Sequence, residues 1–232
     1  MRAGLLHGEV LEVFGTAAAA HRHPDLPELA GDRWTLVERD VLTALADTVQ
    51  PQGVVARCAI PSAQLAQVLA RRPQLLAVAV DVRDPGNAGT LIRCADAAGA
   101  AAVVLAGESV DSWNPKAVRA SAGSVFHLDL PADRDVAGTM AALRTAGLRL
   151  LAADGSGASD LDELADAGAL AGPTAWIFGN EAHGLADDVR RQADDVVRVP
   201  IHGRAESLNL ATAAAVCLYA SARAMRTGGG AD

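Results

Sequence analysis

The stretch DDVVRVPIHGRAESLNLATAAAVCLYASARAMR, residues 194–226, decides the architecture that we expect for the chain. A short apolar strand ends at Pro200, a polar loop follows, and a long Ala-rich helix closes the stretch. Ser207 has the residue type of a helix N-cap, so the helix is predicted to begin there. Its buried stripe recurs at the i, i+3, i+4 spacing: Leu208, Ala211, Ala215, Leu218 and Ala222. We expect the chain upstream to build a pocket against this loop.

Upstream of this stretch, apolar runs alternate with helical patterns from residue 75 onward. Runs such as LLAVAVDV are typical of strands in a parallel sheet that is covered on both faces. Gly99 and Gly147 follow the ends of two of the intervening helices. Strands are expected at residues 75–82, 101–107, 124–130, 148–154, 174–180 and 196–201. The fold class is therefore α/β, with an open, mostly parallel six-stranded sheet.

Residues 1–73 predict a separate, small α/β domain. Its expected strands are residues 9–16, 33–39 and 53–60, and a helix capped by Asp40 lies between the last two. A helix or linker at residues 61–73 leads to the larger domain, residues 74–232. The segment RAGLL near the start resembles the end of a helix, so the small domain is expected to be either minimal or truncated at its start.

The composition limits the class of protein. Half of the 232 residues are hydrophobic, yet no run of about eighteen uncharged apolar residues occurs, so no membrane span is expected. No signal-peptide pattern opens the chain, which favours a cytoplasmic location. The net charge of −8 argues against a broad nucleic-acid-coating surface but permits a local basic patch. The cysteines lack zinc-site spacing and are expected to be buried thiols: Cys58, Cys94 and Cys217.

Three loops are predicted at the carboxyl ends of strands, where ligands bind in sheets of this kind. In RDPGNAGTLIR, residues 83–93, a tight turn leads into a helix that carries Arg93 about one turn in. In WIFGNEAHGL, residues 176–185, Gly179 permits close backbone approach by a ligand. The third is the loop at residues 200–210. Each loop alone also has a structural explanation, such as a surface arginine, a loop histidine or a helix cap.

Two familiar nucleotide-binding signatures are missing. The first strand of the larger sheet is not followed by G-x-G-x-x-G, and no G-x-x-x-x-G-K-[ST] occurs anywhere in the chain. A nucleotide-dependent oxidoreductase on a doubly wound sheet is therefore disfavoured, although it stays an alternative.

Together, and in this order, the three loops resemble those of the SpoU (TrmH-type) branch of the SPOUT RNA methyltransferases. The first family motif, N-x-G-x-x-x-R, matches Asn87, Gly89 and Arg93. The second, G-N/A-E-x-x-G, matches residues 179–184, and the third, I-P-M-x-G-x-x-x-S-L-N-V-S, is seen as VPIHGRAESLNLAT. The resemblance covers residues 75–226. The stretch DTVQPQGVVARC also resembles the end of the ribosomal-protein-like RNA-binding domain that often precedes this one.

The resemblance implies a deep C-terminal trefoil knot, a bound S-adenosylmethionine and a homodimer with both active sites near the interface. The reaction would transfer a methyl group to a ribose 2′-hydroxyl of RNA, with no metal. Arg93 would have an electrostatic role, favouring the alkoxide-like state of that hydroxyl. Contacts with the cofactor carry over to Gly179, Val199, Ile201 and Leu208. The residues that would hold Arg93 and the ribose are Asn87, Glu181, Ser207 and Asn209.

The expected partner is RNA. Basic residues in the first two loops of the sheet are expected to bind its phosphates along a local track, and these residues are Arg83, Lys116 and Arg119. The 23S ribosomal RNA is the expected substrate, and transfer RNA is the alternative. A non-catalytic RNA-binding protein that kept the fold is a further alternative, which the intact motif residues disfavour. Two departures from the third motif are mild, Ile201 for methionine and Ala211 for serine.

Overall fold

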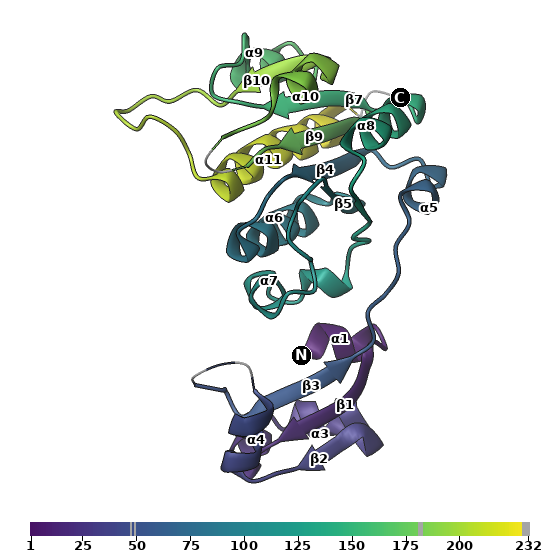
Figure 1. Cartoon of the computed structure of the whole chain (residues 1–232), viewed down its shortest axis with the longest axis vertical. Helices are drawn as coiled ribbons and strands as arrows, with labels where there is room; N and C mark the ends of the chain where they lie inside the picture. Colours follow the sequence, from purple (N-terminus) through teal and green to yellow (C-terminus); the bar gives the residue numbers. More distant parts are fainter. Residues whose placement is uncertain (47, 49, 181–182, 229–232) are drawn as a thin grey trace. The chain divides into compact units, whose positions relative to one another are not determined.

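A computed structural model of the chain describes residues 1–46, 48, 50–180 and 183–228 (Figure 1). The chain forms two compact units, Met1–Pro61 and Ser62–Asp232. Helix α5 (Leu65–Ala70) lies in the expected linker, and its Val68 is buried in the core of the second unit. The division between the units therefore falls just before the linker. None of the helices in the described ranges is long and apolar enough to cross a membrane.

In the described part of the first unit, the three expected strands are present, and they form a sheet in the order β2-β1-β3. Strand β2 is parallel to β1, and β3 is antiparallel to it. The cap expected at Asp40 is wrong, because helix α4 begins one residue earlier and Asp40 lies in its first turn. The elements are α1 (Arg2–Leu6), β1 (Val10–Gly15), α2 (Ala17–Arg22), α3 (Asp25–Ala30), η1 (Gly31–Arg33), β2 (Trp34–Leu36), α4 (Arg39–Leu45) and β3 (Val54–Cys58).

The described residues of the second unit form a seven-stranded sheet in the order β6-β5-β4-β9-β7-β10-β8, and every pair of neighbours is parallel. Each residue of β4 is buried, because apolar side chains alternate between two covered faces. The α/β class and the parallel sheet are thus confirmed. The strands are β4 (Leu75–Val80), β5 (Ala102–Ala106), β6 (Ala132–Asp133), β7 (Arg149–Ala153), β8 (Ser159–Asp160), β9 (Thr174–Phe178) and β10 (Asp195–Arg198).

The expected set of six strands differs from the observed one in three places, because one expected strand is absent and two short strands are added. The segment 124–130 is not a strand: it begins as the 3-10 helix η2 (Ser124–Phe126), and Asp129 makes only an isolated bridge to Ala102. Val125 is buried in the core beside α6, and the Phe126 ring lies 5.8 Å from that of Trp113. Packing against helices has therefore overridden the strand pattern. The two added strands, β6 and β8, are two residues long each.

Helices cover both faces of this sheet and complete its core. One core cluster joins alternate strand residues to α6, α9 and α11, and the other joins the remaining strand residues to α5, α8 and α10. Figure 1 shows α11 running beside β9 and α6 beside β4. The bounds of these helices are α6 (Pro85–Ala98), α7 (Pro115–Ala120), α8 (Val136–Thr145), α9 (Leu161–Asp166), α10 (Asp187–Gln192) and α11 (Leu210–Gly228).

Polar contacts fix α11 on the sheet. The buried indole Nε1 of Trp176 on β9 donates to Ser221 Oγ at 2.9 Å. Burial raises the pKa of the Cys217 thiol on the same helix to about 12, so this thiol is neutral. The expected burial is confirmed for Cys217, whereas Cys58 and Cys94 are half-buried.

Strand β9 lies between β4 and β7, so the chain crosses over its earlier strands. The trefoil knot itself stays a prediction.

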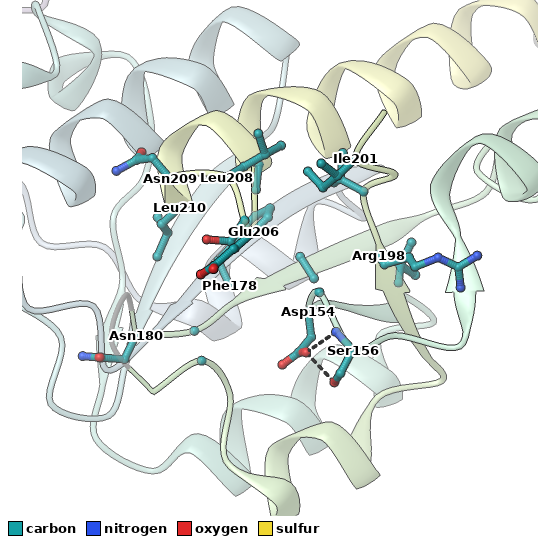
Figure 2. Close-up of a pocket in the computed structure, with 18 of the residues that line it drawn as sticks. Asp154, Ser156, Phe178, Asn180, Arg198, Ile201, Glu206, Leu208, Asn209 and Leu210 are labelled. Carbon is teal, nitrogen blue, oxygen red and sulfur yellow. Dashed lines mark hydrogen bonds between the residues drawn. The ribbon is translucent and has the colours of Figure 1, made fainter. Parts of the chain in front are cut away.

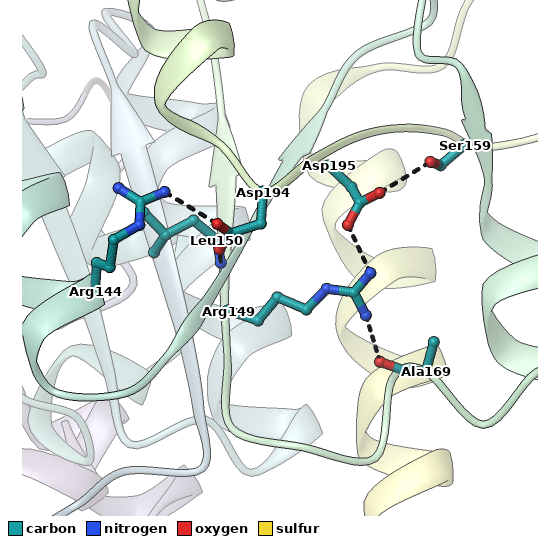
Figure 3. Close-up of polar contacts among 7 residues, drawn as sticks. All are labelled: Arg144, Arg149, Leu150, Ser159, Ala169, Asp194 and Asp195. Atoms are coloured by element: carbon teal, nitrogen blue, oxygen red, sulfur yellow. Dashed lines mark hydrogen bonds and ion pairs between the residues drawn. The ribbon is translucent and has the colours of Figure 1, made fainter.

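A polar network holds the amino ends of β7 and β10 together (Figure 3). Arg149 donates to Asp195 at 2.5 Å, and Asp194 accepts the backbone N–H of Leu150 at 2.8 Å. Asp194 also pairs with Arg144 at 3.1 Å. Partial burial alone would raise the pKa of Asp194, but the Leu150 hydrogen bond and Arg144 outweigh it, so the pKa lies below its usual value. This edge is structural, and it leaves the carboxyl ends of the strands for the site.

Candidate active site

A pocket of about 1020 Å³ opens at the carboxyl ends of β7, β9 and β10. Its walls come from four segments: 153–156 after β7, 178–180 with 183–184 at the end of β9, 197–201 at the end of β10, and 206–210 at the start of α11. Asn87 and Arg190 also line it. Figure 2 shows Leu208 and Asn209 at the start of α11, with Asn180 and Asp154 on the loops below them. The pocket therefore forms where a doubly wound sheet binds its ligands.

The first motif is helical from its start, unlike the tight turn that was expected. Asp84 caps α6 by accepting the backbone N–H of Asn87 at 2.8 Å, and Pro85 occupies the first helical position. Asn87 is thereby fixed in the first turn, at the pocket. Gly89 serves helix packing: a Cβ there would lie 2.3 Å from the carbonyl oxygen of Ala117 on α7.

Arg93 lies more than two turns into α6, not one. It is exposed and is not among the residues that line the pocket. It lies six positions beyond Asn87, which is about 9 Å along the helix axis. Within the described part of the chain, its guanidinium makes no hydrogen bond or ion pair. The structure thus brings Asn87 to the pocket but leaves Arg93 facing solvent.

The second motif forms a tight loop after β9. Asn180 and Gly184 exchange two backbone hydrogen bonds, of 3.1 and 2.8 Å. A Cβ on Gly179 would lie 2.5 Å from the backbone of Gly184, so the close approach that this glycine permits is made by the chain itself. The side-chain amide of Asn180 donates to the carbonyl of Asp81 at 2.9 Å and ties the loop to β4. Glu181 lies outside the described residues.

The third motif supplies most of the upper wall. Val199, Ile201, Ser207, Leu208 and Asn209 all line the pocket. The cap expected at Ser207 is wrong, because α11 begins at Leu210 and the Asn209 side-chain oxygen accepts the N–H of Ala211 at 2.9 Å.

Asn209 also joins two motifs. Its amide nitrogen donates to Asn87 Oδ1 at 3.1 Å, a contact between residues 122 positions apart. The sequence places both asparagines in motifs, and the structure shows that their side chains are in contact at the start of α11. This contact holds the start of α11 against the start of α6.

The residues of the expected phosphate track lie outside the pocket lining. Arg83, Lys116 and Arg119 are exposed, and Lys116 pairs with Asp84 at 2.9 Å. Lys116 and the N–H of Asn87 hold the pKa of the Asp84 carboxyl below its usual value. Lys116 therefore stabilises the cap of α6, which is a local task separate from any contact with RNA.

A fourth wall of the pocket was missed by the sequence reasoning. It is the loop after β7, where Asp154 accepts hydrogen bonds from the N–H and the hydroxyl of Ser156, at 2.8 and 2.6 Å. Arg190 on α10 reaches Asp154 at 3.4 Å. Arg198 pairs with Asp160 at 3.1 Å, and Figure 2 shows its side chain directed away from the other labelled residues. The sequence does indicate this wall, because the apolar run 148–154 ends in Asp-Gly-Ser-Gly, a polar loop at the carboxyl end of a predicted strand.

Comparison with known proteins assigns the family. The SpoU rRNA Methylase family matches residues 74–219. The "23S rRNA (guanosine(2553)-2'-O)-methyltransferase RlmP" of Bacillus subtilis is 34% identical over 184 residues, which span 79% of this chain and 70% of that protein. The "23S rRNA (uridine(2479)-2'-O)-methyltransferase" of Streptomyces viridochromogenes is 35% identical over 190 residues, spanning 79% and 65%. The crystal structure of the SpoU methyltransferase AviRb from Streptomyces viridochromogenes in complex with AdoMet matches with a TM-score of 0.83 and 30% identity, over 98% of this chain and 88% of that one. The chain described here therefore belongs to the SpoU rRNA methylase family.

Proposed function

We propose that this protein transfers a methyl group from S-adenosylmethionine to a ribose 2′-hydroxyl of 23S ribosomal RNA. The observation that carries the proposal is the pocket at the carboxyl ends of β7, β9 and β10, which the second and third motifs line together with Asn87. Two relatives, 34% and 35% identical over the aligned residues, are named as 23S rRNA 2′-O-methyltransferases. Family membership and the pocket thus support the same reaction class.

The residues of the pocket fit this cofactor. Its volume of about 1020 Å³ is at the upper end of small-molecule sites. Gly179 lets the end of β9 lie directly against Gly184 in one wall of the pocket, because a side chain at residue 179 would collide with the Gly184 backbone. Val199, Ile201 and Leu208 offer apolar surface to an adenosyl group, and Gly179 adds backbone groups beside them. When bound, the cofactor's sulfonium supplies an electrophilic methyl group, so no metal is required for its activation.

The remaining motif residues would act on the RNA ribose. We infer that Asn87 and Asn209, joined at 3.1 Å, orient the ribose at the start of α11, with Ser207 beside them. Arg93 would contact the RNA from its exposed place on α6, where a guanidinium can stabilise a phosphate or a developing alkoxide. Glu181 keeps its proposed role of holding the arginine and the ribose. Arg83 and Arg119 would extend the positive surface along the RNA backbone.

A homodimer is proposed for the assembly. Val216 and Tyr219 on α11 are 41% and 48% exposed, which is high for large side chains on a helix that otherwise packs in the core. Such an apolar surface on the helix next to the site suits a second copy of the chain. Residues 1–73 are proposed to bind RNA, and residues 74–232 to carry out catalysis. A cytoplasmic location is proposed as well, and a ribosomal substrate supports it.

The test is transfer of a radiolabelled methyl group to purified 23S ribosomal RNA and, separately, to transfer RNA, followed by mapping of 2′-O-methylated nucleotides. Label on a ribose of 23S RNA supports the proposal, and label only on transfer RNA supports the alternative substrate. Binding of the cofactor without transfer to either RNA would favour a non-catalytic RNA-binding protein. Arg93→Ala should lower transfer by about 100-fold or more, the usual effect of losing one group that stabilises developing charge, while leaving cofactor affinity unchanged.

A further inference from the structure

We propose that Asp154 is a cofactor-binding residue, whose carboxylate accepts a hydrogen bond from a donor group of bound S-adenosylmethionine. The donor is either a ribose hydroxyl or the α-ammonium of the methionine part. The inference rests on the proposed function, and it assigns a role to a residue that lies in none of the three motifs.

The first observation is where Asp154 lies. It follows the last residue of β7 directly, at the same edge of the sheet as the loops that carry the second and third motifs. It lines the pocket, and its side chain is only 14% exposed. A buried carboxylate on the wall of a ligand pocket is held there at a desolvation penalty, which a partner in the pocket would offset.

The second observation is how its two oxygens are used. Both bonds from Ser156 go to Oδ1, at 2.8 and 2.6 Å. Within the described residues, Oδ2 has one partner, Arg190, at the long distance of 3.4 Å. Figure 2 shows the second oxygen of Asp154 turned away from Ser156. Holding the turn therefore uses one oxygen and leaves acceptor capacity on the other.

The third observation is that the loop is fixed in place. The N–H of Asp154 donates to the carbonyl of Val197 on β10 at 3.0 Å, and the N–H of Gly157 donates back to Asp154 at 3.0 Å. A Cβ on Gly157 would lie 2.6 Å from the carbonyl of Val196, so the loop rests directly on β10. The carboxylate is thus preorganised, which lowers the entropy lost when a ligand binds.

The charge of Asp154 selects the kind of ligand group. Burial alone would raise its pKa, but the bonds from Ser156 and the nearby Arg190 outweigh that effect, and the pKa lies below the usual value. The side chain is therefore an anion at neutral pH and can only accept hydrogen bonds. It would repel an RNA phosphate, whereas the hydroxyls and the ammonium of the cofactor are donors. The partner expected here is consequently the cofactor and not the RNA backbone.

The test is calorimetric titration of the full chain with two ligands, S-adenosylhomocysteine and 5′-methylthioadenosine. Both contain the ribose hydroxyls, and only the first contains the α-ammonium. Asp154→Asn keeps the shape of the side chain and an oxygen for Ser156 but removes the charge. We expect it to weaken binding of S-adenosylhomocysteine on the order of 10- to 100-fold, as for other hydrogen bonds to a charged group. An equal loss for methylthioadenosine assigns a hydroxyl as the donor, and no loss for it assigns the α-ammonium.

Asp160→Asn is the matched control. Asp160 lies on the same segment with a side chain that is 13% exposed, and it does not line the pocket. Its partner Arg198 does line the pocket, but Figure 2 shows the Arg198 side chain directed away from the other labelled residues. Its capping of α9, through the N–H of Asp162 at 3.0 Å, is a task that asparagine also performs. The control should bind both ligands as the wild-type protein does. Thermal unfolding of each variant checks that the fold is retained, and Asp154→Ser repeats the test if Asp154→Asn unfolds.

Two results would overturn the inference. Wild-type affinity of Asp154→Asn for both ligands would show that the carboxylate does not contact the cofactor. An equal loss in Asp154→Asn and Asp160→Asn would show that the segment acts only through its stability. If the wild-type protein binds neither ligand, the proposed function fails first, and this outcome is distinct from both.

Discussion

Replacing Asn209 separates the two tasks that its side chain performs. Its oxygen caps α11 through the N–H of Ala211, and its nitrogen donates to Asn87. Asn209→Ala removes both bonds. Asn209→Ser keeps an oxygen that can cap the helix but is too short to reach Asn87. The pair of variants therefore distinguishes the start of the helix from the link between the motifs.

The magnitude follows from the cap. Loss of an asparagine cap costs about 1 kcal/mol, and serine retains most of the effect. At about 0.59 kcal/mol for RT, 1 kcal/mol is about a fivefold increase in local opening of the first turn of α11. Hydrogen–deuterium exchange of peptides that cover residues 208–216 measures this opening. We expect exchange about fivefold faster in Asn209→Ala, and close to wild type in Asn209→Ser.

Methyl transfer gives the second readout. Both variants should transfer more slowly, because neither holds the two asparagines together. Thr212→Ala is the control, since Thr212 is exposed on the same turn and makes no hydrogen bond through its side chain among the described residues. Unchanged exchange in Asn209→Ala would refute the capping argument. Full methyl transfer by Asn209→Ser would refute the role given to the link with Asn87.

Three further predictions concern the body of the catalytic unit. Gly179→Ala should lower thermal stability and abolish S-adenosylhomocysteine binding in calorimetry, because its Cβ would meet backbone at 2.5 Å, whereas Gly172→Ala, which lies outside the pocket lining and has nothing within 4 Å, should retain both. Ser221→Ala leaves the Trp176 indole N–H buried without its acceptor, so urea unfolding should show a loss of about 1–3 kcal/mol; no loss would mean that another acceptor replaces it. The pKa of Asp194 is lowered in the folded protein, so its carboxylate stabilises the fold above its unfolded pKa, and this stabilisation is lost as the pH falls through the lower folded pKa. In Asp194→Asn, the free energy of unfolding should therefore fall less steeply with decreasing pH in that range. An unchanged pH dependence would contradict this.

The sequence predicts the sheet and its ligand-binding edge well. The apolar runs at β4, β5, β7, β9 and β10 are long and end in glycine, asparagine, aspartate or proline, so their carboxyl ends can be located without a structure. Because parallel strands share one edge, the loops after β9 and β10 were expected to meet, and they do. The sequence was sufficient for the prediction wherever the residues of a single helix or strand determine its structure.

The predictions fail where contacts between residues far apart in the sequence determine the structure. Ser207 and Asn209 are both capping residue types, and only the structure shows that Asn209 caps the helix, through the N–H of Ala211, while its nitrogen donates to Asn87. The segment 124–130 alternates like a strand, but its apolar side chains pack on α6. Asp154 was overlooked because its loop matches no motif, although it occupies the same edge of the sheet.

The contact between Asn87 and Asn209 also shows how far along the chain the pocket is completed. The two residues lie 122 positions apart, and the last wall of the pocket arrives only with the start of α11. Contacts so distant along the chain form late, after the loops between them have closed. A chain cut short by a stop codon before residue 206 would therefore lack the residues that form the last wall of the pocket.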